Sequence, residues 1–205
     1  MRTLKMLGVA MVLFISMLLI QSCDNTCDTV TCQNGGECTD GVCSCPSGYT
    51  GDLCQYADCS IVQCPTNSTC EDDPTTGEGL CVCDAGYDGD SCQIQCRTKF
   101  VGAYNVDDSC TSGTYAYASS ITTSVSGVTT MVISNFGGFN VNINAVLDDC
   151  DTFSIPQQTD ASNRIFVSTS AGTRNATTGQ FSFTYHVTFT TDNTFDDCDP
   201  VFTPQ

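Results

Sequence analysis

The sequence has no tryptophan, one histidine and few basic residues, and each shortage excludes a class of function. Its 6 lysine and arginine residues stand against 23 acidic ones, which gives a formal net charge of −17. Binding a nucleic-acid backbone needs clustered basic side chains, so nucleic acid is excluded as a partner. His186 alone cannot supply the Cys/His mixture of many zinc sites, and no familiar pair of nucleophile and base can be built around it. We find no phosphate-binding or cofactor motif, and we predict no cofactor and no enzymatic activity.

Cysteine, in contrast, is abundant, with 17 residues in a chain of 205. Cytosolic thiols are kept reduced, whereas disulfides persist in oxidising compartments. The paired Cys-x2-Cys knuckles of zinc ribbons do not occur, which favours disulfides over zinc. The chain is therefore predicted to lie outside the cytosol.

The first 22 residues have the pattern of a signal peptide. Arg2 and Lys5 precede an apolar run that is too short for a comfortable membrane span, and the chain then becomes polar. The following Ile20-Gln21-Ser22-Cys23 resembles the bacterial lipobox, which implies cleavage before Cys23 and a lipid on its thiol. The alternative is ordinary cleavage after Ser22 with Cys23 unmodified. Removing Cys23 from the 17 cysteines leaves 16, an even number, which favours the lipid.

Twelve cysteines form two repeats of six. Residues 27–54 have the spacing C-x4-C-x5-C-x4-C-x-C-x8-C, and residues 59–92 have C-x4-C-x5-C-x10-C-x-C-x8-C. Only the third gap differs, as expected where a hairpin loop absorbs an insertion. Segments of this size bury too little apolar surface to fold without covalent bridges.

These repeats closely resemble EGF-like modules, which we assign to residues 27–54 and 55–92, with residues 23–26 as the lipid-anchored N-terminus. Spacing alone leaves 15 pairings open to six cysteines. The resemblance implies the bridges Cys27–Cys38, Cys32–Cys43, Cys45–Cys54, Cys59–Cys70, Cys64–Cys81 and Cys83–Cys92.

Residues 96–205 are predicted to form an all-β domain. Apolar and polar residues alternate with period two across residues 139–147 and 181–190, which is typical of strands with one buried face. Frequent turn signals, including Gly137-Gly138 and Thr178-Gly179, separate the segments. We expect an antiparallel meander of about eight strands, closed as a barrel or split into a sandwich.

Two resemblances bear on this domain. Residues 100–106 resemble the start of lipocalin-like barrels, with Tyr104 in place of the tryptophan of that family. The whole segment resembles the C-terminal domains that follow EGF-like modules in surface lipoproteins of marine Bacteroidetes.

The closed meander makes a prediction about the last four cysteines. With strands numbered from about residue 99, Cys110 and Cys198 fall in connections at one end of the barrel. Cys96 and Cys150 fall at the other end. This parity selects Cys110–Cys198 and Cys96–Cys150 from the three pairings open to four cysteines.

If Cys110 pairs with Cys198, the acidic residues beside them converge on one rim. These residues are Asp107, Asp108, Asp196, Asp197 and Asp199. Converging carboxylates repel one another, and a hard cation with oxygen ligands relieves that repulsion, so we consider a calcium site there. The alternative is a set of solvated turn acids with no ion.

Taken together, these features favour a cell-surface binding or adhesion protein. A lipid on Cys23 would hold it on the bacterial outer membrane, the EGF-like modules would act as a spacer, and the β domain would meet a protein or glycan at the cell surface. Two alternatives remain: a secreted eukaryotic ligand or matrix protein without lipid, and a lipocalin-like carrier of a small ligand.

Overall fold

The computed structural model describes residues 26–205, so the predicted signal peptide and the lipidation site Cys23 lie outside the described residues. The chain divides into two compact units. The first contains the described residues up to Val62 together with Asp72–Leu80, and the second contains Gln63–Glu71 and Cys81–Gln205. The division passes through the second EGF-like module.

The first unit consists mainly of short strands that are cross-linked by disulfides. Its elements are η1 (Thr26–Asp28), β1 (Glu37–Thr39), β2 (Val42–Ser44), β3 (Tyr49–Thr50) and β4 (Tyr56–Ala57). β1 pairs with β2 across a tight turn in which Asp40 and Gly41 both have positive φ, and β3 pairs with β4. Its bridges are Cys27–Cys38, Cys32–Cys43 and Cys45–Cys54. Cys54 is the one fully buried apolar side chain described in this unit, so the bridges take the place of a hydrophobic core.

The second module has the same short strands and the same kind of bridge. Its strands are β5 (Ser68–Asp72), β6 (Gly79–Cys83), β7 (Tyr87–Asp88) and β8 (Ile94–Gln95). Cys64 bonds to Cys81 and Cys83 to Cys92, while Cys59 and Cys70 are also disulfide-bonded. The bonds Cys64–Cys81 and Cys83–Cys92 match two of the pairs that the resemblance to EGF-like modules implies for this module.

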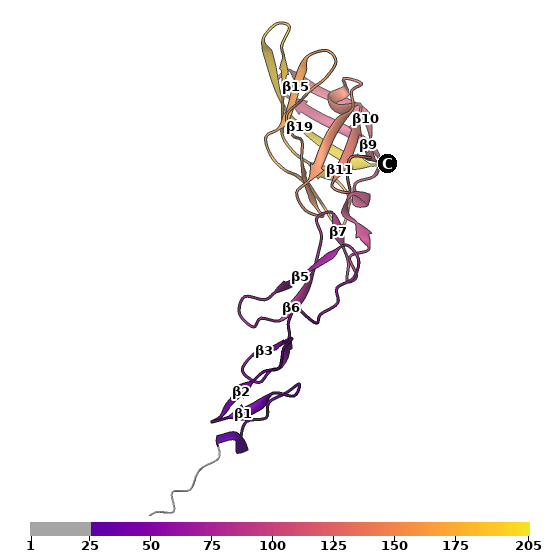
Figure 1. Cartoon of the computed structure of the whole chain (residues 1–205). Coiled ribbons are helices and arrows are strands. Elements are labelled where there is room, and N and C mark those ends of the chain that lie inside the picture. The colour runs from indigo at the N-terminus through magenta and orange to yellow at the C-terminus, as the bar shows by residue number, and fades with distance from the viewer. Residues whose placement is uncertain (1–25) are drawn as a thin grey trace, which may run out of the picture. The chain divides into compact units, whose positions relative to one another are not determined.

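The rest of the second unit is an antiparallel β-barrel (Figure 1). After η2 (Cys96–Lys99) come β9 (Gly102–Cys110), β10 (Gly113–Thr123), β11 (Thr130–Ser134), η3 (Phe136–Gly138), β12 (Ile143–Leu147), β13 (Thr152–Ser154), β14 (Gln158–Thr159), β15 (Arg164–Ser168), β16 (Gly172–Arg174), β17 (Phe181–Ser182), β18 (Tyr185–Phe189) and β19 (Thr194–Pro204). Eight strands close in the order β9-β10-β11-β12-β13-β16-β17-β19 and back to β9. The expected all-β class and the barrel alternative are therefore confirmed.

β19 closes the barrel because its C-terminal part pairs with β17 on one side and with β9 on the other. Its first half pairs with β18, and the segment from Cys198 onward pairs with β9 in the register Cys198↔Cys110 to Pro204↔Tyr104. Closure leaves no free edge between the first and last strands, which removes a site for unwanted strand pairing.

Aromatic rings fill the centre of the barrel. Phe181 stacks on Phe202 with ring centroids 4.7 Å apart and meets Phe153 edge to face at 5.5 Å. Phe100 and Phe166 are fully buried in the same cluster. Tyr104 is also buried there, and its hydroxyl donates to the Phe100 carbonyl at 2.6 Å. The middle of the barrel is thus a packed core rather than a ligand cavity.

Two expected strand segments are interrupted. In residues 139–147 only Ile143–Leu147 form a strand, because Asn135, Gly137, Gly138 and Asn140 have positive φ and turn the chain through η3. The segment from Phe181 breaks at residues 183–184, where the Thr184 amide donates to the Ser170 hydroxyl rather than to a neighbouring strand.

Candidate functional site

One end of the barrel contains a cavity of about 600 Å³, which we call the barrel-mouth pocket. Residues of the β9–β10 turn, β10, η3, β18 and β19 line it. Its aromatic lining residues are Tyr115, Tyr117, Phe139, Tyr185, Phe189 and Phe195. Small residues leave this space open: Ala116, Gly137 and Gly138 also contribute to the lining. A Cβ on Gly137, whose φ is +62°, would come within 2.7 Å of the Phe139 ring.

A buried acid lies directly behind this lining. Asp108 is only 1% exposed, and its Oδ2 accepts hydrogen bonds from the hydroxyls of Tyr117 at 3.0 Å and Tyr185 at 2.8 Å. Its Oδ1 faces Cys110 Sγ at 3.7 Å, and a disulfide sulfur has no hydrogen to donate. Burial raises the pKa of Asp108, and the two tyrosine hydrogen bonds only partly oppose that rise.

The same hydrogen-bond network sets the protonation state of Tyr117 and Tyr185. Burial, followed by the nearby Asp108 charge, raises the pKa of both Tyr117 and Tyr185 far above the ordinary phenol value. Both hydroxyls therefore stay protonated and continue to donate to Asp108. The hydroxyl of a buried tyrosine needs a hydrogen-bond acceptor. The place of Tyr185 on the apolar face of its strand was therefore the sequence signal that a buried acceptor exists.

A second acid, Asp196, holds the β9–β10 turn and faces the pocket. It accepts hydrogen bonds from the Thr111 and Ser112 hydroxyls and, at 3.0 Å, from the Ser112 amide. Burial opposes ionisation of Asp196, but the hydrogen bonds from Ser112 and Thr111 outweigh it and lower the pKa. Asp196 is 7% exposed, so the pocket has an ionised carboxylate in its wall.

The five acids lie on the two paired strands β9 and β19 near the Cys110–Cys198 bridge, but they do not share one face of the barrel. Successive strand residues point to opposite faces, so Asp108 and Asp196 point inward while Asp107, Asp197 and Asp199 are exposed outside the barrel. Asp197 instead lies 2.7 Å from the Nδ1 of His186. The one group of potential metal ligands among the described residues, Asp108 with Cys110 and Cys198, contains two disulfide-bonded cysteines, which cannot act as thiolate ligands. The five acids therefore do not form the oxygen-ligand set that we considered for calcium.

The structure contains both of the disulfides selected by strand parity, Cys110–Cys198 and Cys96–Cys150. Two placements behind that argument were wrong, because Cys110 is the last residue of β9 and Cys198 lies within β19, so neither lies in a connection. The bond is thus a cross-strand bridge between register partners on the two strands that close the barrel.

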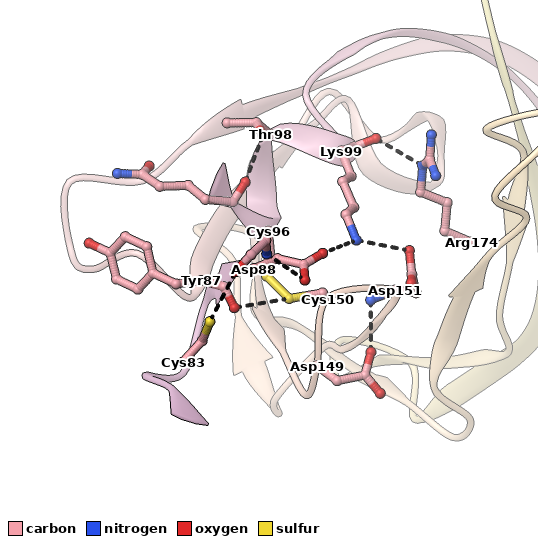
Figure 2. Close-up of polar contacts among 12 residues, drawn as sticks. Cys83, Tyr87, Asp88, Cys96, Thr98, Lys99, Asp149, Cys150, Asp151 and Arg174 are labelled. Atoms are coloured by element: carbon pink, nitrogen blue, oxygen red, sulfur yellow. Dashed lines mark hydrogen bonds and ion pairs between the residues drawn. A yellow bond between two sulfur atoms is a disulfide. The ribbon is translucent and has the colours of Figure 1, made fainter. Parts of the chain in front are cut away.

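The opposite end of the barrel is joined to the second module (Figure 2). Cys96 of η2 bonds to Cys150 in the β12–β13 connection. Lys99 Nζ lies 2.9 Å from Asp88 Oδ2 on β7 and 3.6 Å from Asp151 Oδ1 on the barrel. The Asp88 hydrogen bond is the main cause that raises the pKa of Lys99, so the lysine stays charged.

Two arginines complete this junction. Arg97 donates to the carbonyls of Ser124 at 2.8 Å and Gly127 at 2.7 Å, and Arg174 Nε donates to the Lys99 carbonyl at 3.0 Å. We did not predict this role from the sequence. The concentration of basic residues at 97–99 in so acidic a chain was the available signal.

Comparisons with known proteins bear on the N-terminal part. A family model described as an EGF-like domain matches residues 23–54. A neurogenic locus notch homolog protein from Giardia intestinalis is 48% identical over 48 residues, which is 22% of this chain and 7% of that protein. The chain thus spans a small fraction of this relative's length. The first module is EGF-like, and such disulfide-bonded modules indicate an extracellular or surface protein.

The similarity to a solved structure is slight. A solved structure of unknown function from Bacteroides ovatus has a TM-score of 0.33 and 11% identity, covering 52% of this chain and 42% of that one. Within residues 26–205, no helix has the length and apolar character needed to span a bilayer.

Proposed function

We propose that this chain is a cell-surface binding protein that captures its ligand at the barrel-mouth pocket. The observation that carries the proposal is a cavity at the open end of a barrel whose centre is otherwise filled by side chains. The mouths of β-barrels are preferred places for ligand sites, and aromatic walls with a few polar groups are their usual lining. The EGF-like modules act as the spacer that carries this barrel.

The rim of the pocket carries two exposed aromatic side chains. Tyr115 is 47% exposed and Phe195 is 62% exposed, and both line the pocket. Exposed aromatic residues are typical anchors for proteins and glycans. We propose that the ligand is part of a protein or glycan at a cell surface, and that these two rings make the first contacts.

A binding screen with matched variants tests the proposal. The native protein is screened against glycan arrays and surface proteins, and Tyr115→Ala and Phe195→Ala are then measured against each partner found. We expect each variant to weaken binding by about tenfold or more. The control is Val125→Ala, since Val125 is fully exposed on the β10–β11 connection and is not part of the pocket lining. Unchanged binding in both rim variants would refute the proposal.

We further propose that a lipid on Cys23 holds the protein on the bacterial outer membrane. The lipobox-like residues before Cys23 and the even number of remaining cysteines support this. The test is the intact mass of the native protein after detergent extraction. A chain that begins at Cys23 and is heavier by its acyl groups supports the anchor, whereas an unacylated chain favours the secreted alternative.

A small-ligand carrier is a second candidate, since the pocket volume of about 600 Å³ suits a small molecule. A carrier would release a small molecule on solvent extraction of the purified protein, whereas an adhesion protein would not. We propose no catalysis in either case, because all 16 cysteines among residues 26–205 are disulfide-bonded, which leaves no thiol among them to act as a nucleophile.

A further inference from the structure

The barrel-mouth pocket presents electron-rich groups to its ligand. Its walls carry the rings of Tyr115, Tyr117, Phe139 and Phe189 together with the Asp196 carboxylate, and no lysine, arginine or histidine is among its lining residues. Aromatic faces carry partial negative charge, so these rings and the carboxylate act with the same sign.

The hydroxyl groups of four lining residues, Ser112, Tyr115, Tyr117 and Tyr185, already donate hydrogen bonds inside the protein. The Tyr117 and Tyr185 hydroxyls donate to Asp108, and the Ser112 hydroxyl donates to Asp196. The Tyr115 hydroxyl lies 3.0 Å from Ser112 Oγ and donates to it, because the Ser112 hydrogen is directed at Asp196. These hydroxyl oxygens keep lone pairs, not hydrogens, for a ligand.

The Asp196 carboxylate has no basic partner among the residues that line the pocket. Arg164, which does not line the pocket, lies 4.4 Å over one face of the Phe139 ring and is paired with Asp160 at 2.6 Å. Asp196 itself is nine-tenths buried and receives only neutral donors. An ionised carboxylate in a partly desolvated wall attracts a cation more strongly than one in open water.

We infer that the ligand group held in this pocket is an organic cation, an ammonium on an apolar body. The inference deepens and rests on the proposed function. An ammonium placed against aromatic faces gains cation–π attraction, and the nearby carboxylate adds charge pairing. An anion would be repelled, and a bare metal ion would find aromatic carbon where it needs several oxygen ligands.

The test compares three probes of similar shape and different charge. They are benzyltrimethylammonium, its neutral isostere neopentylbenzene, and benzoate, each titrated into the native full-length protein at low ionic strength. We expect the cation to bind about tenfold more tightly than the neutral probe and benzoate to show no binding. Equal binding of the cation and the neutral isostere, or binding of benzoate, would overturn the inference.

Variants at Tyr115 separate the ring from its hydroxyl, and the exposure of this residue means that either change should be tolerated by the fold. We expect Tyr115→Phe to keep the affinity for benzyltrimethylammonium and Tyr115→Leu to lose most of it. Equal affinities for the two variants would contradict the cation–π role. If none of the three probes binds, the pocket proposal itself fails. If the neutral probe binds as well as the cation, only the inference about charge fails.

Discussion

Removing the Cys96–Cys150 disulfide should be the most damaging cysteine change at the junction between the second module and the barrel. The bridge spans 54 residues of sequence, from η2 to the β12–β13 connection. A cross-link that closes a loop of this length stabilises the folded state by about 4 kcal/mol, because it restricts the unfolded chain. Cys96 is also fully buried, so its loss leaves a gap in packed surroundings.

We therefore expect the double variant Cys96→Ala/Cys150→Ala to lower the free energy of unfolding of the barrel by about 4 kcal/mol. With a urea dependence near 2 kcal/mol per molar, the midpoint should fall by about 2 M. Urea titration followed by far-UV circular dichroism, which the barrel strands dominate, measures this change.

The control for this experiment is a disulfide in the other compact unit. Cys45→Ala/Cys54→Ala removes a bridge that spans only 9 residues and lies in the first unit. We expect it to leave the urea midpoint of the barrel unchanged. A fall of less than about 1 kcal/mol in the Cys96→Ala/Cys150→Ala variant would refute the loop-closure reasoning.

Three further predictions concern the barrel interior. Asp108→Asn should change the pH dependence of stability: the pKa of Asp108 is raised by burial, so its contribution is present below about pH 4 and is lost as the pH rises through the folded-state pKa. Thermal unfolding at several pH values should show that loss in the native protein, and its persistence in the variant would be inconsistent with our assignment. Gly137→Ala should cost about 1–2 kcal/mol, because φ is +62° and a Cβ would contact the Phe139 ring, and urea titration would show this. Phe181→Ala should cost about 3–5 kcal/mol in the same assay, since its ring contacts the rings at the barrel centre, and a neutral effect would contradict the packed core.

The EGF-like pattern and the all-β class were predictable because both depend on residues that lie close together in the sequence. The cysteine gaps of the two modules are short-range spacings, and the period-two alternation of the last 110 residues reflects the two faces of each strand. Strand parity also selected the disulfide pairs at the two ends of the barrel, because parity survives small errors in strand boundaries.

The chemistry of the pocket was less predictable, since it depends on contacts far apart in sequence. Asp108 and Tyr185 are 77 positions apart and meet only because the barrel closes. The five acids looked alike in the sequence, but alternation within β9 and β19 sends Asp108 and Asp196 inward and the others outward. The misplaced start of β19 hid this division, because residues assigned to a connection are not expected to alternate between two faces as strand residues do.

The most direct test of the account is the location of a bound ligand. The measurement is a nuclear magnetic resonance titration of the isotope-labelled protein with benzyltrimethylammonium, followed through backbone amide shifts. We expect shifts confined to the β9–β10 turn, η3 and the β18–β19 hairpin, the elements that form the barrel-mouth pocket. Shifts centred on the EGF-like modules or on the outer face of the barrel would show that the pocket is not the recognition site.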